Sequence, residues 1–274
     1  MRRPLFIIIF IIGLGIFSYP IVSNYYSTKV HLSVVNEYRE IVQTMERSEI
    51  EGERQKANEH NEKLKSSQLN FVDPFSDDND EQNQTEGNKS YYDALNIGPA
   101  IGNINIPKIN TRLPMYHGTS EKVLSRGVGH LENSSLPTGK RGTHSVLTAH
   151  RGLPSSKLFR DLDKITVGDQ FFIEVLDETY AYEVFEVDIV LPHETDWLQM
   201  DDDKEIVTLL TCEPYMINTH RMLVKGERIP YELEVVASDF QTSDGKSSFL
   251  LHIVASCIAL VMMTVIIIRR KRRG

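Results

Sequence analysis

The sequence contains too few cysteines to build a disulfide framework. Among its 274 residues there are two, Cys212 and Cys257, and only Cys257 lies inside a long apolar run. Because the two thiols would lie in different phases they cannot pair, which excludes the small secreted domains that depend on disulfides. A lone cysteine outside the apolar runs is either a small core residue or a nucleophile, and composition alone favours the core residue.

Patterns for binding metal ions or nucleic acids are absent as well. No cluster of His, Cys and carboxylate side chains has the spacing of a metal site, and the DDND tract at residues 77–80 lacks the glycine and the final glutamate of an EF-hand loop. All 38 Asp and Glu but only 23 of the 30 Lys and Arg lie between the two long apolar runs, a net charge of −15. This acidity argues against nucleic acid as a partner, and we expect neither a metal nor a cofactor.

Two apolar runs, residues 5–22 and 249–268, dominate the ends of the sequence. A transmembrane helix needs about 20 mostly apolar residues, so each run can span a bilayer. No Ala-x-Ala-like site follows the first run, which favours an uncleaved signal anchor over a removed signal peptide. Cationic residues flank the outer end of each run, and such flanks stay in the cytoplasm. We therefore expect a cell-membrane protein with both termini cytoplasmic and residues 25–248 outside the cell.

The sequence after the first run changes texture twice. Apolar residues recur at a helical spacing across residues 28–68 among many charged residues, which predicts a helical stalk. From 69 to 95 the sequence is polar and acidic, with few side chains to bury, which predicts a flexible exposed segment. The expected divisions are residues 1–24 (cytoplasmic tip and anchor), 25–68 (stalk), 69–95 (flexible segment), 96–240 (folded domain), 241–248 (linker), 249–268 (second span) and 269–274 (basic tail).

Short β-rich runs separated by Gly, Pro, Asn and Asp fill the chain from residue 97 onward. About 140 residues of small strands close most economically as a barrel, so we predict a mainly β, closed barrel with a few short helices. Helices are expected at residues 120–124 and 155–162, the second with Ser155 as its N-cap. Strands are expected at residues 101–109, 112–117, 144–149, 170–176, 179–191, 205–211 and 221–225.

Cys212 follows the end of one of these expected strands. The run from Glu205 to Thr211 is continuously β-rich, and Pro214 comes two residues after the cysteine. A strand end is held stiffly yet opens onto a cleft, which suits a nucleophile that has to be both positioned and reachable.

Arg221 begins the next β-rich run, nine residues after Cys212. If the two strands pair as neighbours, the guanidinium and the thiol face each other across a short loop. A nearby cation increases the thiolate fraction of a cysteine, and a guanidinium can hold the oxyanion of a tetrahedral intermediate. Seen in isolation, however, such an arginine is more often a surface ion-pair residue.

His150 also follows a strand, in the segment TAHRGLP, where a Gly-containing turn comes next. A cysteine nucleophile needs an acid to protonate the leaving amine, and histidine suits that task near neutral pH. His144 and His220 are rivals for this role, and spacing alone does not select among the three.

A family resemblance separates these alternatives. The segment TLLTCEPYMINTHRMLVKGER resembles the sortase signature, and TAHRGLP resembles the histidine segment of that family, with Ala149 where glycine is more usual. The resemblance covers residues 97–230, with three separated motifs in the family's order. It implies a catalytic sortase barrel in which Cys212 is the nucleophile, His150 the general acid and base, and Arg221 the cation that holds the oxyanion or positions the substrate. Their neighbours Ala149, Leu210 and Thr211 are then candidates for substrate binding.

Two features resemble the pilin-polymerising class C sortases in particular. One is the second apolar run, and the other is Asp73-Pro74-Phe75, which looks like the lid of that class. The resemblance implies that Asp73 pairs with Arg221 and that the Phe75 ring covers Cys212. A pseudo-substrate tripeptide on a flexible tether can occupy a cationic, apolar cleft at high effective concentration. A tripeptide of this composition is as readily an ordinary turn.

The expected activity is that of a cysteine transpeptidase on a Gram-positive surface. The resemblance implies that Cys212 cleaves LPxTG-type sorting signals of pilins through a thioester, which the lysine amine of another pilin subunit resolves into an isopeptide bond. The partners are then pilin proteins that carry such a signal and an acceptor lysine, and the membrane through two spans.

Two other functions stay open. One is a housekeeping sortase, which would attach surface proteins to a peptidoglycan-precursor amine. The lid-like tripeptide and the second span argue against this function. A surface adhesin or pilin would also end in an apolar run and a basic tail, but it would carry LPxTG just before that run, where this sequence has residues 241–248, QTSDGKSS. The Leu-Pro-Thr-Gly at residues 136–139 lacks the variable residue and lies in mid-domain, which predicts a loop.

Overall fold

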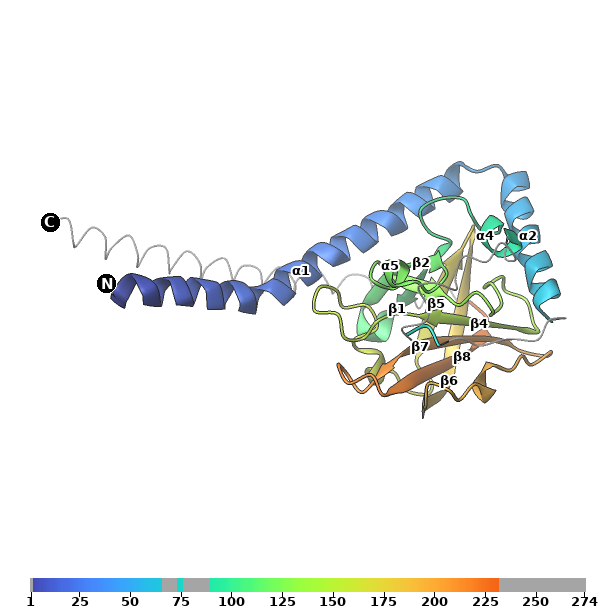
Figure 1. Ribbon diagram of the computed structural model, residues 1–274. Helices are drawn as coiled ribbons and strands as arrows, with labels where there is room; N and C mark the ends of the chain where they lie inside the picture. The colour runs from blue at the N-terminus through green and yellow to red at the C-terminus, as the bar shows by residue number, and fades with distance from the viewer. Residues whose placement is uncertain (1, 66–72, 76–88, 232–274) are drawn as a thin grey trace. The chain divides into compact units, whose positions relative to one another are not determined.

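The computed structural model describes residues 2–65, 73–75 and 89–231 (Figure 1). The chain divides into two compact units, and the larger one comprises residues 28–153 and 157–232. The eight strands that the structure describes and every candidate site residue belong to this larger unit. The second expected span, residues 249–268, lies outside the described residues.

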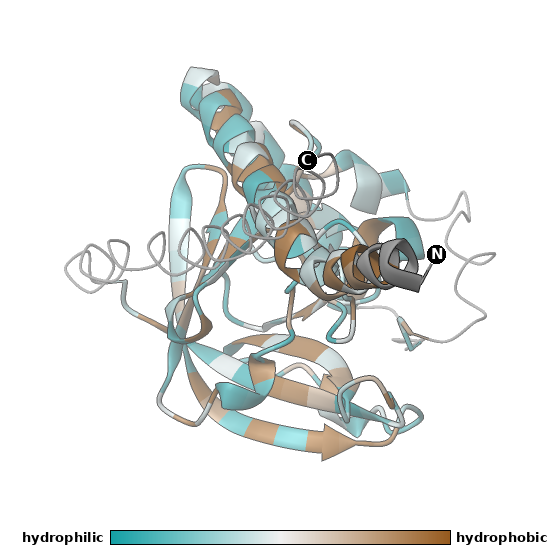
Figure 2. Cartoon of the chain, turned by 90° about the vertical axis from the view of Figure 1, so that its left-hand side faces the viewer, coloured by the Kyte–Doolittle hydropathy of each residue, from teal (hydrophilic) through white to brown (hydrophobic). Residues whose placement is uncertain are grey.

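The first apolar run is the beginning of a long helix, α1 (Arg2–Thr44). Residues 9–44 of this helix are long and apolar enough to cross a membrane by length and composition. Figure 2 shows hydrophobic residues around the early turns of α1, where large apolar side chains are exposed. A second helix, α2 (Arg47–Lys65), follows after a short break. The helical periodicity predicted for residues 28–68 is therefore confirmed up to residue 65.

The prediction of a mainly β, closed barrel is confirmed. Around the barrel the strands follow the order β1-β2-β3-β4-β7-β8-β6-β5. The pairs β2/β3 and β4/β7 are parallel, and the other pairs are antiparallel. The strands are β1 (Gly102–Ile106), β2 (Thr111–His117), β3 (Val128–His130), β4 (Thr143–Thr148), β5 (Gln170–Val175), β6 (Glu178–Val190), β7 (Glu205–Glu213) and β8 (His220–Ile229).

Three of the predicted elements differ from the structure. The strand predicted at residues 221–225 is longer and continues to Ile229 as β8. The first strand stops at Ile106, where Pro107 starts the 3₁₀ turn η2 (Pro107–Ile109). The helix predicted at residues 155–162 is wrong. Leu158 there has a φ of +38°, which a helix does not allow, and a 3₁₀ turn, η3 (Leu162–Lys164), follows. Burial explains the difference, because Leu158 and its neighbour Phe159 turn into the core.

The shorter predicted helix is confirmed as α5 (Glu121–Leu124), preceded by Ser120 in an extended conformation. Strand β3 has no counterpart among the predicted strands, because three residues with a central glycine give no alternating signal. A further short helix, α4 (Lys89–Asp93), precedes the barrel.

The core contains aromatic and branched side chains of the longer strands. Phe171 of β5 and Tyr182 of β6 stack with ring centroids 5.3 Å apart. Gly226 of β8 makes room for them, because a Cβ there would lie 2.5 Å from the Phe171 ring. Strand β7 is buried along eight of its nine residues, so both of its faces are covered. A strand held in this way gives Cys212 a rigid support.

The end of α1 is fastened to the barrel by one buried tyrosine. The Tyr38 hydroxyl donates to the carbonyl oxygen of Ile101 (3.2 Å) and accepts from the backbone N–H of Leu176 (2.8 Å). Arg39 beside it makes hydrogen bonds of 2.5 to 2.8 Å to the carboxylate of Glu174 in β5.

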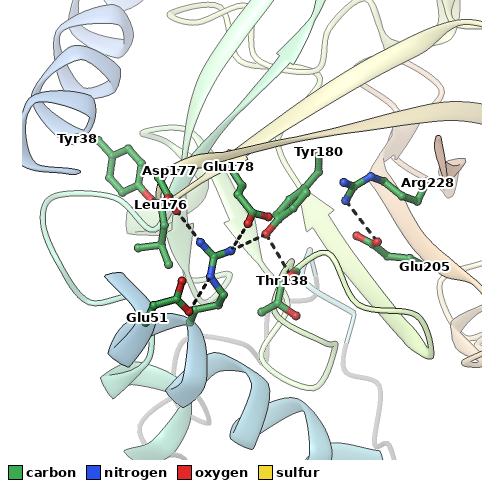
Figure 3. A network of polar contacts seen from close by, with 10 residues as sticks. Tyr38, Glu51, Thr138, Leu176, Asp177, Glu178, Tyr180, Glu205 and Arg228 are labelled. Atoms are coloured by element: carbon green, nitrogen blue, oxygen red, sulfur yellow. Dashed lines mark hydrogen bonds and ion pairs between the residues drawn. The ribbon is translucent and has the colours of Figure 1, made fainter. Parts of the chain in front are cut away.

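Helix α2 is fastened in the same way. Arg54 pairs with Asp177 (2.5 Å) and Glu178 (3.0 Å), acceptors that Figure 3 shows converging with Glu51 on one guanidinium. The Asn61 side chain donates to the Leu136 carbonyl (2.9 Å) and accepts from its N–H (2.8 Å), so the predicted loop at 136–139 is bound to the helix. The predicted stalk thus packs on the barrel through residues of both α1 and α2.

Candidate active site

Cys212 and Arg221 lie directly opposite each other in the antiparallel pair β7/β8. The expectation that these two strands are neighbours, with the two side chains facing across a short loop, is confirmed. Both residues are buried, with 4% of Cys212 and 5% of Arg221 exposed. The pairing brings a thiol and a guanidinium together at one end of the barrel.

The parallel pair β4/β7 brings His150 to the same end. Thr148 is paired with Leu210, so His150 and Cys212 each lie two residues beyond a paired position. The N–H of Ala149 donates to the Leu210 carbonyl (3.3 Å), which extends the pairing by one residue toward His150. Three side chains expected at the centre of the site therefore come from the ends of three strands.

Ala149, Leu210 and Thr211 are fully buried at this end of the barrel. The Thr211 hydroxyl donates to the Ala149 carbonyl (2.7 Å), which ties the end of β7 to the segment that carries His150. In the described conformation these side chains hold the site together, and their assignment to substrate binding stays a prediction.

The tripeptide Asp73-Pro74-Phe75 occupies the site. Arg221 Nε donates to Asp73 Oδ1 (2.9 Å) and Arg221 Nη2 to Asp73 Oδ2 (2.5 Å), a bidentate ion pair whose side chains are 6% and 11% exposed. The expected contact between Asp73 and Arg221 is thus confirmed.

Phe75 contacts both Arg221 and His150. Its ring centroid is 5.3 Å from the guanidinium carbon of Arg221 and 5.5 Å from the centroid of the His150 ring. The direct cover of Cys212 by this ring stays a prediction. Beneath Phe75 lies a small apolar cluster formed by Leu131, Val146, Leu198, Leu210 and Leu223.

Burial raises the pKa of the Cys212 thiol to about 11, and the Asp73 carboxylate adds to this rise. The cations Arg221 and Arg151 act in the opposite direction but do not outweigh burial. The thiol is therefore protonated at neutral pH while the tripeptide is in place, and a protonated thiol is a poor nucleophile. Removing Asp73 and exposing the sulfur would both favour the thiolate.

The rival histidines differ from His150 in their surroundings. His144 is buried in the barrel, where its ring nitrogens bond to the Gln199 carbonyl (2.9 Å) and the Thr208 hydroxyl (2.7 Å). Burial lowers the pKa of His144 to about 4, so it stays neutral as a core residue. His220 is bound to the Thr219 hydroxyl (2.9 Å). Of the three, His150 is the one whose ring contacts the tripeptide.

Three contacts of the site have no signal in the sequence. His150 Nε2 lies 2.9 Å from the carboxylate of Glu121 in α5. Arg151 forms ion pairs with Glu213, the residue after Cys212, and with Asp163 (3.0 Å). The partners are separated by irregular loops and by other elements, so no helix or strand periodicity connects them.

Residues 2–65, 73–75 and 89–231 contain no group of three or more His, Cys, Asp or Glu side chains that could hold a metal ion.

Comparison with known proteins identifies a domain and several relatives. The family model of the sortase domain matches residues 104–229. Sortase D of Bacillus subtilis (strain 168) is 33% identical over 135 residues, which cover 48% of this chain and 65% of that protein. Sortase A of Bacillus anthracis is 28% identical over 137 residues, covering 50% and 63%. The chain thus spans less than two thirds of the length of each of these curated relatives.

Solved structures match over a larger share of the chain. Sortase C1 of Streptococcus agalactiae, in its complex with MTSET, is 42% identical with a TM-score of 0.65, covering 73% of this chain and 99% of that one. Sortase C of Streptococcus pneumoniae is also 42% identical with a TM-score of 0.65, covering 73% and 97%. A pilus-related sortase C of Group B Streptococcus is 38% identical with a TM-score of 0.64, covering 72% and 97%.

Proposed function

Because the chain belongs to the sortase family of cysteine transpeptidases, we propose that it joins pilin subunits by cleaving an LPxTG-type sorting signal and forming a lysine isopeptide bond. The observation that carries this proposal is the site itself. Cys212 lies opposite Arg221, His150 follows the neighbouring strand β4, and an Asp-Pro-Phe tripeptide contacts both Arg221 and His150.

The first half of the proposed reaction forms a thioester. The Cys212 thiolate attacks the carbonyl carbon between Thr and Gly of the sorting signal, and Arg221 donates hydrogen bonds to the oxyanion that develops. His150 gives a proton to the leaving amine of the Gly side, and the peptide bond breaks as the acyl-enzyme forms. A guanidinium freed from Asp73 has the N–H donors that this step requires.

The second half consumes the thioester. The uncharged lysine amine of an acceptor pilin attacks the same carbonyl, His150 accepts its proton, and the Cys212 thiolate leaves. The product is an isopeptide bond between the threonine carbonyl and the lysine, and the enzyme returns to its starting state. His150 therefore alternates between acid and base.

The tripeptide 73–75 restrains this reaction in the proposed function. Asp73 neutralises Arg221, and both Asp73 and burial keep Cys212 protonated. Phe75 packs against the apolar cluster, and in the proposed function a hydrophobic residue of the sorting signal packs there instead. Substrate must displace the tripeptide before any thioester can form.

The choice of pilin as substrate is supported by the tripeptide and by the pilus-related relative. The second candidate, a housekeeping sortase that transfers to a peptidoglycan-precursor amine, uses the same first half-reaction. The two differ in the acceptor amine. The function of a non-enzymatic surface adhesin does not require Cys212, His150 and Arg221 to lie at one end of the barrel.

The location follows from the same proposal. The N-terminal apolar helix supports anchoring in the cell membrane. We place the catalytic domain outside the cell, with a second span at residues 249–268 and both termini in the cytoplasm. Protease added to intact cells should then degrade the barrel but spare an epitope tag placed at either end.

The test uses the full-length chain in detergent micelles. It is mixed with a donor pilin that carries an LPxTG signal and with a lysine-bearing acceptor pilin, and the products are mapped by mass spectrometry. A Thr–Lys isopeptide that disappears in Cys212→Ala supports the proposal. Linkage that persists in Cys212→Ala contradicts it, and transfer only to a glycine-type amine supports the housekeeping function instead.

A further inference from the structure

The His150 ring is held by a carboxylate that the proposed mechanism does not use. Glu121 Oε2 lies 2.9 Å from His150 Nε2. The ring's other contact within the described residues is with Phe75, at a centroid distance of 5.5 Å. One edge of the imidazole thus faces a carboxylate on the barrel, and the ring also touches the tripeptide 73–75.

The position of Glu121 is fixed by the packing of α5. Leu124 of this short helix is buried, and α5 sits directly over Gly129 of β3. A Cβ at Gly129 would lie 2.9 Å from Leu124 and 3.2 Å from Val123, so the absence of a side chain is what allows this close approach.

Strand β3 connects this helix to the histidine. Gly129 is paired with Thr148 of β4, two residues before His150. Glu121 is therefore carried by a helix packed on β3, and His150 follows β4, the strand that is paired with β3. A hydrogen bond between groups supported in this way can hold a ring orientation.

The geometry also selects one tautomer. An ionised carboxylate can only accept hydrogen bonds, so Nε2 must carry the hydrogen and the lone pair of the neutral ring lies on Nδ1. A base whose second nitrogen is fixed by a third group is the arrangement that activated nucleophiles share.

We propose that Glu121 is the positioning residue of His150, which fixes the Nε2–H tautomer so that Nδ1 exchanges protons with the leaving and entering amines. This inference rests on the proposed function of His150. Displacement of the tripeptide removes the Phe75 contact, so in the substrate-bound enzyme Glu121 is the described contact that remains to hold the ring.

The test compares Glu121→Ala with Glu121→Gln in the full-length chain in micelles. Glu121 is 62% exposed, so its ion pair contributes little to folding and both variants should fold. Alanine removes the hydrogen-bond acceptor, and we expect kcat for transfer to fall about tenfold with KM within about twofold of wild type. Glutamine keeps an acceptor oxygen and should retain kcat within about threefold. Glu183→Ala removes an exposed carboxylate from β6 and serves as the matched control.

The tautomer gives a second, independent readout. In ¹⁵N-histidine-labelled protein, with His150→Gln used to assign the signal, wild type should show hydrogen on Nε2 and Glu121→Ala a mixture of tautomers. Unchanged kcat or an unchanged tautomer in Glu121→Ala overturns the inference, as does a Glu121→Gln variant as slow as alanine. If the wild-type chain itself makes no Cys212-dependent product, the proposed function fails and not the role of Glu121 alone.

Discussion

Asp73 and Arg221 are 148 positions apart in the sequence, yet the carboxylate and the guanidinium meet in a bidentate pair with both side chains largely buried. A charge-assisted hydrogen bond to a partly buried group contributes about 1.5–3 kcal/mol. The ion pair therefore stabilises the state in which the tripeptide 73–75 is bound over the site, which we call the closed state. The Asp73 carboxylate also offsets the positive charge of Arg221, the residue paired with Cys212.

Breaking this pair should expose Cys212. In Asp73→Ala combined with Phe75→Ala, the ion pair and the ring contact are both lost, and we expect alkylation of Cys212 by iodoacetamide at pH 7.5 to accelerate about tenfold or more. Each 1.4 kcal/mol removed from the closed state increases the open population about tenfold. The rate is measured by mass spectrometry in a Cys257→Ser background.

Asp202→Ala is the matched control, because Asp202 is exposed and lies near the start of β7, at the opposite end of that strand from Cys212. It should alkylate at the wild-type rate. Equal rates for the double variant and wild type would show that the tripeptide does not restrain the thiol.

The pH at which the alkylation rate of Cys212 has its inflection should also change in this double variant. In the closed state burial and Asp73 raise the pKa of Cys212 to about 11, so the wild-type rate should climb until about that pH. In Asp73→Ala with Phe75→Ala both causes weaken and Arg221 is free to stabilise the thiolate, so the inflection should shift to lower pH. A profile from pH 6 to 11 measures this, and superimposable profiles would refute the electrostatic account.

Strand ends in the sequence made Cys212, His150 and Arg221 candidates, and the resemblance to the sortase signature selected them. A β-rich run that ends near Cys212, with a second run starting at Arg221, predicted that the two side chains face each other if the strands are neighbours, and the structure has Cys212 opposite Arg221. The alternation of short strands and turns likewise indicated a closed barrel.

Contacts that depend on tertiary packing were not accessible. Glu121 is one charged residue among many until β3 places its helix beside His150, and β3 itself is too short to show a period. The segment at residues 155–162 has a helix-like start, but burial of Leu158 and Phe159 overrides that local preference. Local signals fail where distant residues decide the conformation.

The attachment of α1 to the barrel is testable through one hydroxyl group. Tyr38→Phe keeps the ring but leaves the Leu176 N–H without its acceptor in a buried place. We expect a loss of about 1–3 kcal/mol in the free energy of unfolding, measured by urea denaturation. Tyr26→Phe, at a residue that is 70% exposed, should change it by less than about 0.5 kcal/mol. If Tyr38→Phe also changes the free energy of unfolding by less than about 0.5 kcal/mol, water takes the place of the hydroxyl as acceptor for the Leu176 N–H.

Arg151 should matter for both folding and reactivity. It is buried between Glu213 and Asp163, and it lowers the pKa of Cys212 against the effect of burial. Arg151→Met keeps the stem but removes the charge, and we expect about 2–3 kcal/mol of destabilisation. This is less than the ~3–5 kcal/mol for a fully buried pair because Asp163 is 45% exposed. Arg141→Met, at an exposed residue, is the control, and equal urea midpoints for the two variants would contradict this role.

Buried His144 should make the fold sensitive to acid. Its pKa is about 4 in the folded protein because of burial, against 6.5 ordinarily, so between these values the unfolded chain binds a proton that the folded one does not. Stability must then fall as the pH drops from about 6.5 to 4, by about 3 kcal/mol for this residue at pH 4.

His144→Gln removes the titrating group, so the variant should be less stable at pH 7 yet lose less free energy of unfolding on acidification. Urea denaturation at pH 7, 5.5 and 4.5 measures the difference, with exposed His193→Gln as the control. If His144→Gln and wild type lose the same free energy between pH 7 and 4.5, the ring is protonated or hydrated in the native state and its core role is refuted.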